Sequence, residues 1–296
     1  MPAIAIPELR RAITDIRVFS KAICGAELWP HQVAVARSPA RYRVICSGRQ
    51  AGKSRLLSIS ALHKAFTSPG CLVLIVSAGE IAAQRVLADI GDLCTAPLLR
   101  GSVVDETKSR VVLSNGSQIL SVPASQRQVR GWSIDLLILD EAAFIDPELW
   151  RASEPAVIAR PGSRVILCSS PWGDVTHFFR AMWQRGMDSP DEMFESWHWP
   201  SSISPLVDDD LLEEIRKRET AEYFSREYLA AWSSDAGTFF SEAEITGSVA
   251  DYDLISPEAM NLMCPYDSEA GRVIRPFGAA MAGRDNPVSA CDMLKG

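Results

Sequence analysis

The stretch that decides the fold is VICSGRQAGKS, which runs from Val44 to Ser54. An apolar run of strand length leads into a glycine-containing turn, and a helical pattern begins at Lys53 and continues to about Phe66. This order predicts a phosphate-binding loop, because the turn's N–H groups and the positive end of the helix dipole converge on an anion. Lys53 would add charge to the β- and γ-phosphates, and the Ser54 hydroxyl would be a ligand to Mg²⁺.

The first glycine of this loop is out of register. In the pattern G-x-x-x-x-G-K-[ST] it would stand at position 47, where this chain has Ser47, and Gly48 follows one place late. The alternative interpretation is a flexible turn before an ordinary surface helix, which the flanking strand and helix argue against. The residues predicted to surround the phosphates are Gly48, Arg49, Gln50, Ala51, Gly52, Lys53 and Ser54.

The composition is that of an ordinary globular protein. The chain has 296 residues, enough for one large α/β domain or two modest ones. Its seven cysteines lie far apart without a C-x-x-C pair, which argues against a zinc site and a disulfide framework. No apolar run reaches membrane-spanning length and the first residues lack a signal peptide, so we expect a soluble intracellular protein without a membrane partner. The formal charge of −7 neither predicts nor excludes DNA contact by a local basic surface.

Apolar runs of strand length alternate with helical patterns along the chain. This alternation predicts βαβ units and a mostly parallel sheet flanked by helices, the α/β fold of a P-loop NTPase of the RecA/ASCE type. The expected strands cover 44–47, 71–77, 134–139, 164–170 and 193–199, with a β-hairpin at Asn115-Gly116. The expected helices cover 8–23, a short segment up to Ser38, 53–66 and 78–94.

The last third of the chain changes its pattern twice. Residues 207–232 predict a small helical lid, in which a helix over 221–232 carries Phe224, Tyr228 and Trp232 on one face. After about residue 235 glycine, proline, serine and scattered charges prevail. We therefore expect an ATPase domain over 1–235, and over 236–296 a linker, an irregular tail and a small incomplete element.

Two acids follow the apolar strand that ends at Leu139. Asp140 and Glu141 stand at its carboxyl end, where open α/β sheets bind ligands. Asp140 would hold Mg²⁺ beside Ser54, and Glu141 would orient and polarise the water that attacks the γ-phosphate. Alone, such a pair is often a helix cap; beside a phosphate-binding loop we interpret it as catalytic.

Arginines would complete the charge stabilisation. Arg49 could reach the γ-phosphate in cis, and Arg130 could reach a neighbouring subunit's nucleotide as an arginine finger, with Arg127 as its competitor. The alternative for each is a surface salt bridge.

Two further segments have open interpretations. In the segment Leu28-Trp29-Pro30-His31-Gln32, the Trp29 ring could stack on adenine while the Gln32 amide forms a hydrogen bond with the edge of the base. Alternatively, the segment could be a capped surface turn. Ser169 and Ser170 could sense the γ-phosphate, or form only a strand-end turn.

The order of these motifs resembles the large terminase subunit of tailed bacteriophages. The resemblance covers roughly residues 20–240 and rests on WPHQ, SGRQAGKS, QVRGW before LLILDEAAF, CSSPWG, and YFSREYLAAW followed by GTFF. It implies an ATP- and Mg²⁺-dependent motor that packages double-stranded DNA into a procapsid in the cytoplasm of an infected or lysogenic bacterium. Such a motor acts as a homo-oligomeric ring at the portal protein, with the small terminase subunit as partner, and the isolated chain could be a monomer.

The resemblance carries over to the candidate residues. It implies Gln32 for adenine, Arg49, Gly52, Lys53 and Ser54 for phosphates and metal, Asp140 and Glu141 for metal and water, Ser169 and Ser170 for coupling, and Arg130 in trans.

Members of this family normally continue into an RNase H-like nuclease. Residues 277–294 resemble the start of that domain, but Ala280-Met281-Ala282 stands where a metal-binding Asp is expected, and Asp285 and Asp292 do not suffice for two metals. We therefore expect no nuclease activity.

Two other functions compete with the packaging motor. A superfamily 2-type helicase would need a second RecA-like domain, which about 60 further residues cannot supply. A non-catalytic remnant that binds ATP and acts in assembly is the alternative from another class, and steady-state turnover distinguishes it from the motor.

Overall fold

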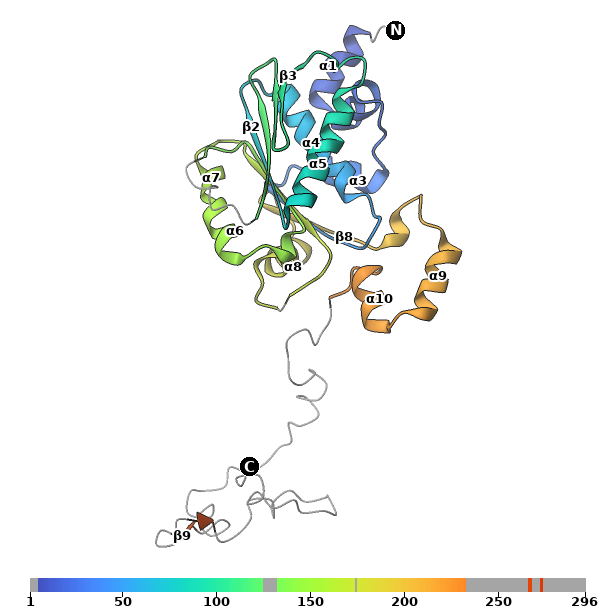
Figure 1. Ribbon diagram of the computed structural model, residues 1–296, viewed down its shortest axis with the longest axis vertical. Coiled ribbons are helices and arrows are strands. Elements are labelled where there is room, and N and C mark those ends of the chain that lie inside the picture. Colours follow the sequence, from blue (N-terminus) through green and yellow to red (C-terminus); the bar gives the residue numbers. More distant parts are fainter. Residues whose placement is uncertain (1–4, 125–131, 174, 233–265, 268–271, 274–296) are drawn as a thin grey trace. The chain divides into compact units, whose positions relative to one another are not determined.

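In the computed structural model the described residues are 5–124, 132–173, 175–232, 266–267 and 272–273 (Figure 1). The chain divides into two units, Met1–Phe239 and Phe240–Gly296. In the second unit the described residues form one antiparallel pair, β9 (Tyr266–Asp267) with β10 (Arg272–Val273). Arg127, Arg130 and the predicted nuclease-like segment 277–294 lie outside the described residues.

A single mixed sheet forms the centre of the first unit. Its strands are β1 (Tyr42–Ser47), β2 (Leu72–Ser77), β3 (Val103–Glu106), β4 (Arg110–Leu113), β5 (Gln118–Pro123), β6 (Leu136–Asp140), β7 (Arg164–Ser169) and β8 (Phe194–Trp199). They are ordered β3-β4-β5-β2-β6-β7-β1-β8. The pairs from β5 to β8 along this order are parallel, and β3-β4 and β4-β5 are antiparallel. The mostly parallel sheet and the hairpin at Asn115-Gly116 are thus confirmed; β3 was not predicted.

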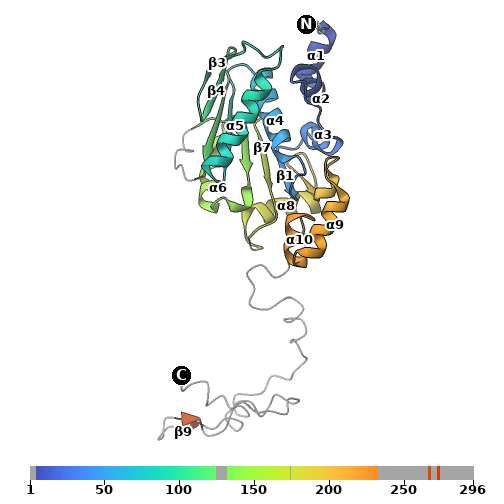
Figure 2. The ribbon, with the colours of Figure 1, turned by 45° about the vertical axis from the view of Figure 1, so that its right-hand side comes forward.

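Helices cover both faces of this sheet (Figures 1 and 2). The segments that precede β1 or follow β1 and β2 are α1 (Ile6–Thr14), α2 (Ile16–Val18), the π-helical segment η1 (Phe19–Ile23), α3 (Pro30–Arg37), α4 (Lys53–Thr67) and α5 (Glu80–Cys94). Those that follow β6 and β7 are η2 (Ala142–Phe144), α6 (Pro147–Ser153), α7 (Pro155–Ile158) and α8 (Phe178–Asp188). After β8 come η3 (Ser201–Ile203), α9 (Asp209–Arg218) and α10 (Ala221–Glu227).

The apolar strands are buried on both sides because successive side chains point to opposite faces. Ile45, Ile75 and Ile138 pack into one core with residues of α1, α3, α4 and α5. Val44 and Leu139, each one position away along its strand, pack into a second core with residues of α6, α7 and α8. This burial is why the middle positions of these strands are apolar on both faces, as expected for parallel strands covered by helices.

The helix predicted over residues 8–23 is interrupted at Asp15. Its backbone is extended there (φ −124°), and its carboxylate accepts the N–H of Arg17 at 2.9 Å and pairs with Arg37. Asp15 therefore ends α1 and caps the next helical segment. The apolar spacing continues across Asp15, but the two sides are buried differently: Phe19 after it is in the core, whereas Ile13 before it is exposed.

The helix predicted over 221–232 is also too long, since α10 ends at Glu227. The ring of Tyr228 stacks on Phe224 at 5.1 Å as expected, but Trp232 does not share their face. It packs against Phe179 and Trp183 of α8, each at 5.8 Å between ring centroids. The chain leaves the helix through Ala230, whose φ of +54° is left-handed, and returns to the sheet.

His63 is a buried titratable group between α4 and the N-terminal segments. Its Nε2 donates to the carbonyl of Ala12 at 3.3 Å, and its ring packs edge-on against Phe19. Burial lowers the pKa of His63 below its ordinary value of 6.5. The unfolded chain therefore binds more protons here as the pH falls, so the stability that His63 contributes is present above about pH 6.5 and is lost below it.

We therefore expect His63→Gln to reduce the loss of stability between about pH 7.5 and pH 5.5. The urea midpoint at each pH measures this, with the exposed His198→Gln as control. Equal losses in the wild type and in His63→Gln would contradict the assignment.

Candidate functional site

The phosphate-binding loop has the backbone of an anion site. Gln50 (φ +59°) and Gly52 (φ +87°) adopt left-handed conformations, and α4 begins directly afterwards. The N–H groups of residues 50–52 donate to no acceptor within the described parts of the chain. Three unpaired donors at the N-terminus of a long helix are what bound phosphate oxygens require.

The segment before α3 holds this loop in place. The Gln32 side chain is fully buried; its Oε1 accepts the N–H of Trp29, and its Nε2 donates to the carbonyl of Gly52, both at 2.8 Å. His31 Nε2 donates to the carbonyl of Ala51 at 3.0 Å. The Gln32 amide, predicted to face adenine, thus faces the loop in this conformation, whereas Trp29 does line the cleft beside the loop.

Gly48 has a packing role that explains its shifted position. Its N–H donates to the carbonyl of Trp199 at 2.8 Å, so this group is not free for a phosphate. A Cβ at Gly48 would lie 2.7 Å from the carbonyl oxygen of Tyr228 and 2.8 Å from Ser201 Oγ. The glycine therefore stands where the lid segment crosses the loop, and Ser47 in front of it is the buried end of β1.

We expect Gly48→Ala to destabilise the protein by about 1–3 kcal/mol, because the methyl group forces the Tyr228 backbone away from the loop. Thermal unfolding measures the effect. The matched control is Gly79→Ala, where a Cβ meets nothing within 4 Å. A melting temperature as high as that of the control would contradict the close approach.

The acidic strand end lies beside the loop lysine. Asp140 is buried at the end of β6; burial and the charge of Glu141 raise its pKa to about 6, and the charge of Lys53 opposes this rise. Glu141 follows with a left-handed backbone (φ +54°), an uncommon conformation for this residue type that functional sites often contain. Ser169 Oγ donates to Glu141 Oε2 at 3.4 Å. Ser170 is buried beside it.

The donors at this strand end fit Mg²⁺. Magnesium in nucleotide sites takes hard oxygen ligands, one or two from the protein and others from phosphates and water. The Ser54 hydroxyl is exposed at the first turn of α4, and the Asp140 carboxylate has a raised pKa because it is buried and lies near the charge of Glu141, which an added cation would offset. Ser54 and Asp140 are therefore the residues that could hold the ion.

Arg49 has a partner that the sequence did not reveal. Its Nε donates to Glu227 Oε2 at 2.8 Å, and its backbone N–H donates to the carbonyl of the same residue at 2.8 Å. Glu227 is buried at the end of α10, and the Arg49 side chain is more than half exposed. The predicted γ-phosphate ligand is thus held by the helical lid in this structure.

The loop, the acidic strand end and the lid enclose one cleft of about 860 Å³. Its polar wall includes Arg49, Lys53, Ser54 and Glu141. The residues lining the cleft that sequence reasoning did not assign to the site are Glu27, Arg55, Arg85, Ser201, Leu206, Val207, Asp208, Tyr228 and the apolar α9 side chains Leu211, Leu212 and Ile215. Only Arg55, next to the loop motif, carried a signal that could have identified it.

Comparison with known proteins gives consistent results. Residues 44–247 match the family model described as terminase large subunit, T4likevirus-type, N-terminal. The terminase large subunit of Thermus virus P23-45 is 29% identical, over 83% of this chain and 54% of its own length. The chain spans about half the length of the curated relatives it matches.

Solved structures share the fold. The large terminase ATPase domain of Thermus phage P74-26 is similar with a TM-score of 0.63 at 24% identity, over 72% of this chain and 97% of that one. The large terminase of a thermophilic bacteriophage, solved in complex with ADP, has a TM-score of 0.58 at 15% identity, over 69% and 54% of the two chains.

Proposed function

The chain belongs to the family of terminase large subunits, in the part that corresponds to their ATPase domain, and we propose that it hydrolyses ATP to drive double-stranded DNA into a procapsid. The observation that carries this proposal is the cleft in which an unpaired anion-binding loop, Lys53 and Glu141 face one another. The relative solved with ADP supports a nucleotide as the ligand.

The loop residues bind and orient the phosphates. The N–H groups of residues 50–52 and the α4 N-terminus take the phosphate oxygens, and Lys53 moves its ammonium from the carbonyl of Gly48, now 3.3 Å away, to the phosphates. A Mg²⁺ ion on Ser54 and Asp140 would neutralise charge on the β- and γ-phosphates. Glu141 accepts a proton from the attacking water, and Ser169 holds its carboxylate in position.

Arg49 would exchange its partner when ATP binds. Its guanidinium is paired with Glu227 and half exposed, so a γ-phosphate in the cleft competes for it directly. Transfer of Arg49 to the phosphate leaves the Glu227 carboxylate at the end of α10 with Arg226, whose Nε donates to Glu227 Oε1 at 3.3 Å. This exchange gives the lid a contact that depends on the presence of the γ-phosphate.

The base would occupy the apolar end of the cleft. Trp29 lies on one wall, and the α9 side chains Leu211 and Ile215 lie on another. An aromatic face and aliphatic groups suit a flat base, and Glu27 and Asp208 supply carboxylate oxygens that can accept hydrogen bonds from an exocyclic amine. Gln32 supports the loop and would have to change partners to reach the base.

The partners follow from the family. We propose a homo-oligomeric ring at the portal protein, with the small terminase subunit as a further partner, in which Arg130 acts on a neighbour's nucleotide. Arg130→Ala and Lys53→Ala subunits, each expected to be inactive alone, should regain part of their turnover when mixed, because an intact loop can then meet an intact finger. Turnover of each mixture at equal total protein measures this, with Arg127→Ala as comparison. No recovery at any ratio would contradict trans action.

Steady-state ATP turnover tests the proposed function. The chain is assayed alone, with double-stranded DNA, and with a procapsid–portal preparation, and Glu141→Gln is the control. Turnover that the packaging partners stimulate and the control lacks supports the motor. Tight ATP binding without turnover under every condition would instead favour the non-catalytic assembly remnant.

A further inference from the structure

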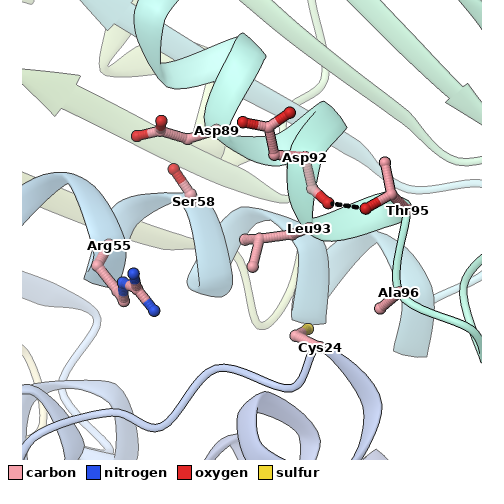
Figure 3. A pocket seen from close by; sticks show the side chains of 8 residues that line it. All are labelled: Cys24, Arg55, Ser58, Asp89, Asp92, Leu93, Thr95 and Ala96. Carbon is pink, nitrogen blue, oxygen red and sulfur yellow. Dashed lines mark hydrogen bonds between the residues drawn. The ribbon is translucent and has the colours of Figure 1, made fainter.

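A second pocket lies between α4, α5 and the end of η1, outside the nucleotide cleft (Figure 3). It has a volume of about 400 Å³. Asp89 and Asp92 from α5 stand on one side, and Cys24 stands on the opposite side of the view. Between them are Ser58 of α4 and Leu93, and the function proposed above uses none of these side chains.

The polar groups of this pocket are unsatisfied. Ser58 is 1% exposed, and its Oγ has no hydrogen-bond partner among the described residues. A buried hydroxyl in that state is uncommon, because desolvation without a partner is unfavourable. Figure 3 shows this hydroxyl on the side of the pocket where Asp89 lies. It is thus directed into the cavity rather than into the core.

Neither aspartate side chain has a hydrogen bond or ion pair with another described residue. Burial and the charge of Asp92 raise the pKa of Asp89, and the charges of Arg55 and Arg85 act against this rise. The carboxylates lie three positions apart on one helix, so they are neighbours on its surface and repel each other. An added positive charge would relieve that repulsion.

The rest of the wall is apolar or neutral. Leu93 and Ala96 contribute aliphatic surface, and burial raises the pKa of Cys24 to about 12, so its thiol stays uncharged. Within the described ranges no three His, Cys, Asp or Glu side chains come together to hold a metal ion. The site thus offers hydrogen-bond acceptors at one end and room for methylene groups at the other.

We propose that this pocket binds an organic cation: an alkylammonium or alkylguanidinium group whose N–H donors meet Asp89, Asp92 and Ser58 and whose aliphatic stem lies against Leu93. Three acceptors converging on one volume match the several N–H donors of such a group. The group can come from a free small molecule or from a lysine or arginine side chain of a second copy of this chain. The chemistry is the same in both cases.

Arg55 connects this pocket to the proposed nucleotide site, since it lines both. A cation bound beside Asp89 would compensate the charge that Arg55 now compensates. The Arg55 guanidinium could then interact with a phosphate in the nucleotide cleft instead. The cation should therefore strengthen nucleotide binding, and the nucleotide should strengthen cation binding by the same factor. This coupling rests on the proposed function, whereas cation binding does not.

Isothermal titration of the nucleotide-free protein with n-butylguanidinium and 1,4-diaminobutane, at constant ionic strength, tests the proposal. We expect saturable binding that Asp89→Asn/Asp92→Asn weakens about tenfold or more and Ser58→Ala weakens less, because hydrogen bonds to charged groups are the stronger ones. Tetramethylammonium, which has no N–H donor, should not bind. Glu80→Gln, on the same helix but outside the pocket, is the matched control. Thermal melts check that each variant is folded.

Sedimentation of the same proteins over a range of concentrations distinguishes the two sources. Binding of the free cations that the double variant loses assigns the pocket to a small molecule. Self-association that the double variant loses, without binding of free cations, assigns it to a side chain of a second copy. The proposal is overturned if neither cation binding nor self-association is observed, or if cation binding persists in the double variant. Binding of ADP with and without saturating n-butylguanidinium tests the coupling; unchanged affinity overturns the coupling alone.

Discussion

Glu141→Gln is expected to lower ATP turnover by about 10²–10⁴-fold, the usual contribution of a general base, while nucleotide binding is retained. Glutamine has nearly the shape of glutamate but cannot accept the proton of the attacking water. Lys53, Ser54 and Asp140, which hold the phosphates and the metal in the proposed mechanism, are unchanged. The measurement is steady-state turnover together with the dissociation constant of ATP.

Two controls make this result specific. Glu148→Gln changes an exposed carboxylate on α6 that pairs only with Arg151 in the described chain, so its turnover should match the wild type. Ser169→Ala removes the hydroxyl that contacts Glu141, and we expect a smaller loss. Full turnover in Glu141→Gln would exclude this residue as the base.

Arg49→Ala is expected to have the second large effect, a loss of turnover of about 10³-fold, at the lower end of what charge-stabilising arginines contribute in phosphoryl transfer. The structure adds a second expectation, because Arg49 is paired with Glu227 before the nucleotide arrives. Glu227→Gln removes this competitor, so ATP should bind more tightly than in the wild type. Arg49→Ala should bind ATP with unchanged or weaker affinity.

Combining Arg49→Ala with Glu227→Gln tests whether Arg49 exchanges Glu227 for the γ-phosphate or whether the two residues act independently. If Arg49 leaves Glu227 for the γ-phosphate, the gain in ATP affinity from Glu227→Gln should disappear in the Arg49→Ala background. ADP lacks the γ-phosphate, so its binding should respond less to either change. Equal effects of Glu227→Gln on ATP and ADP, or a gain that persists without Arg49, would contradict the exchange.

The parts of the fold that follow from local pattern were predictable. The middle positions of strands β1, β2, β6 and β7 are continuous apolar runs, and helices on both faces of the sheet bury them. The hairpin at Asn115-Gly116 follows from turn chemistry. The helices predicted through Asp15 and through Ala230 were too long, because a side-chain cap or a left-handed residue overrides periodicity there. Strand β3 and helices α6, α7 and α8 were not predicted.

Within the site, the sequence by itself determined which polar and charged residues lie at the carboxyl edge of the sheet. Lys53 and Ser54 begin a helix directly after a glycine turn, and Asp140 and Glu141 end a buried strand, so neighbouring residues alone set their places. Tertiary structure decided their partners. Gln32 turns to Gly52, Gly48 accommodates Tyr228, and Arg49 pairs with Glu227 across 178 positions of sequence. Such contacts depend on where α3 and the lid return to the loop, and that path is set by the packing of the whole domain rather than by local spacing.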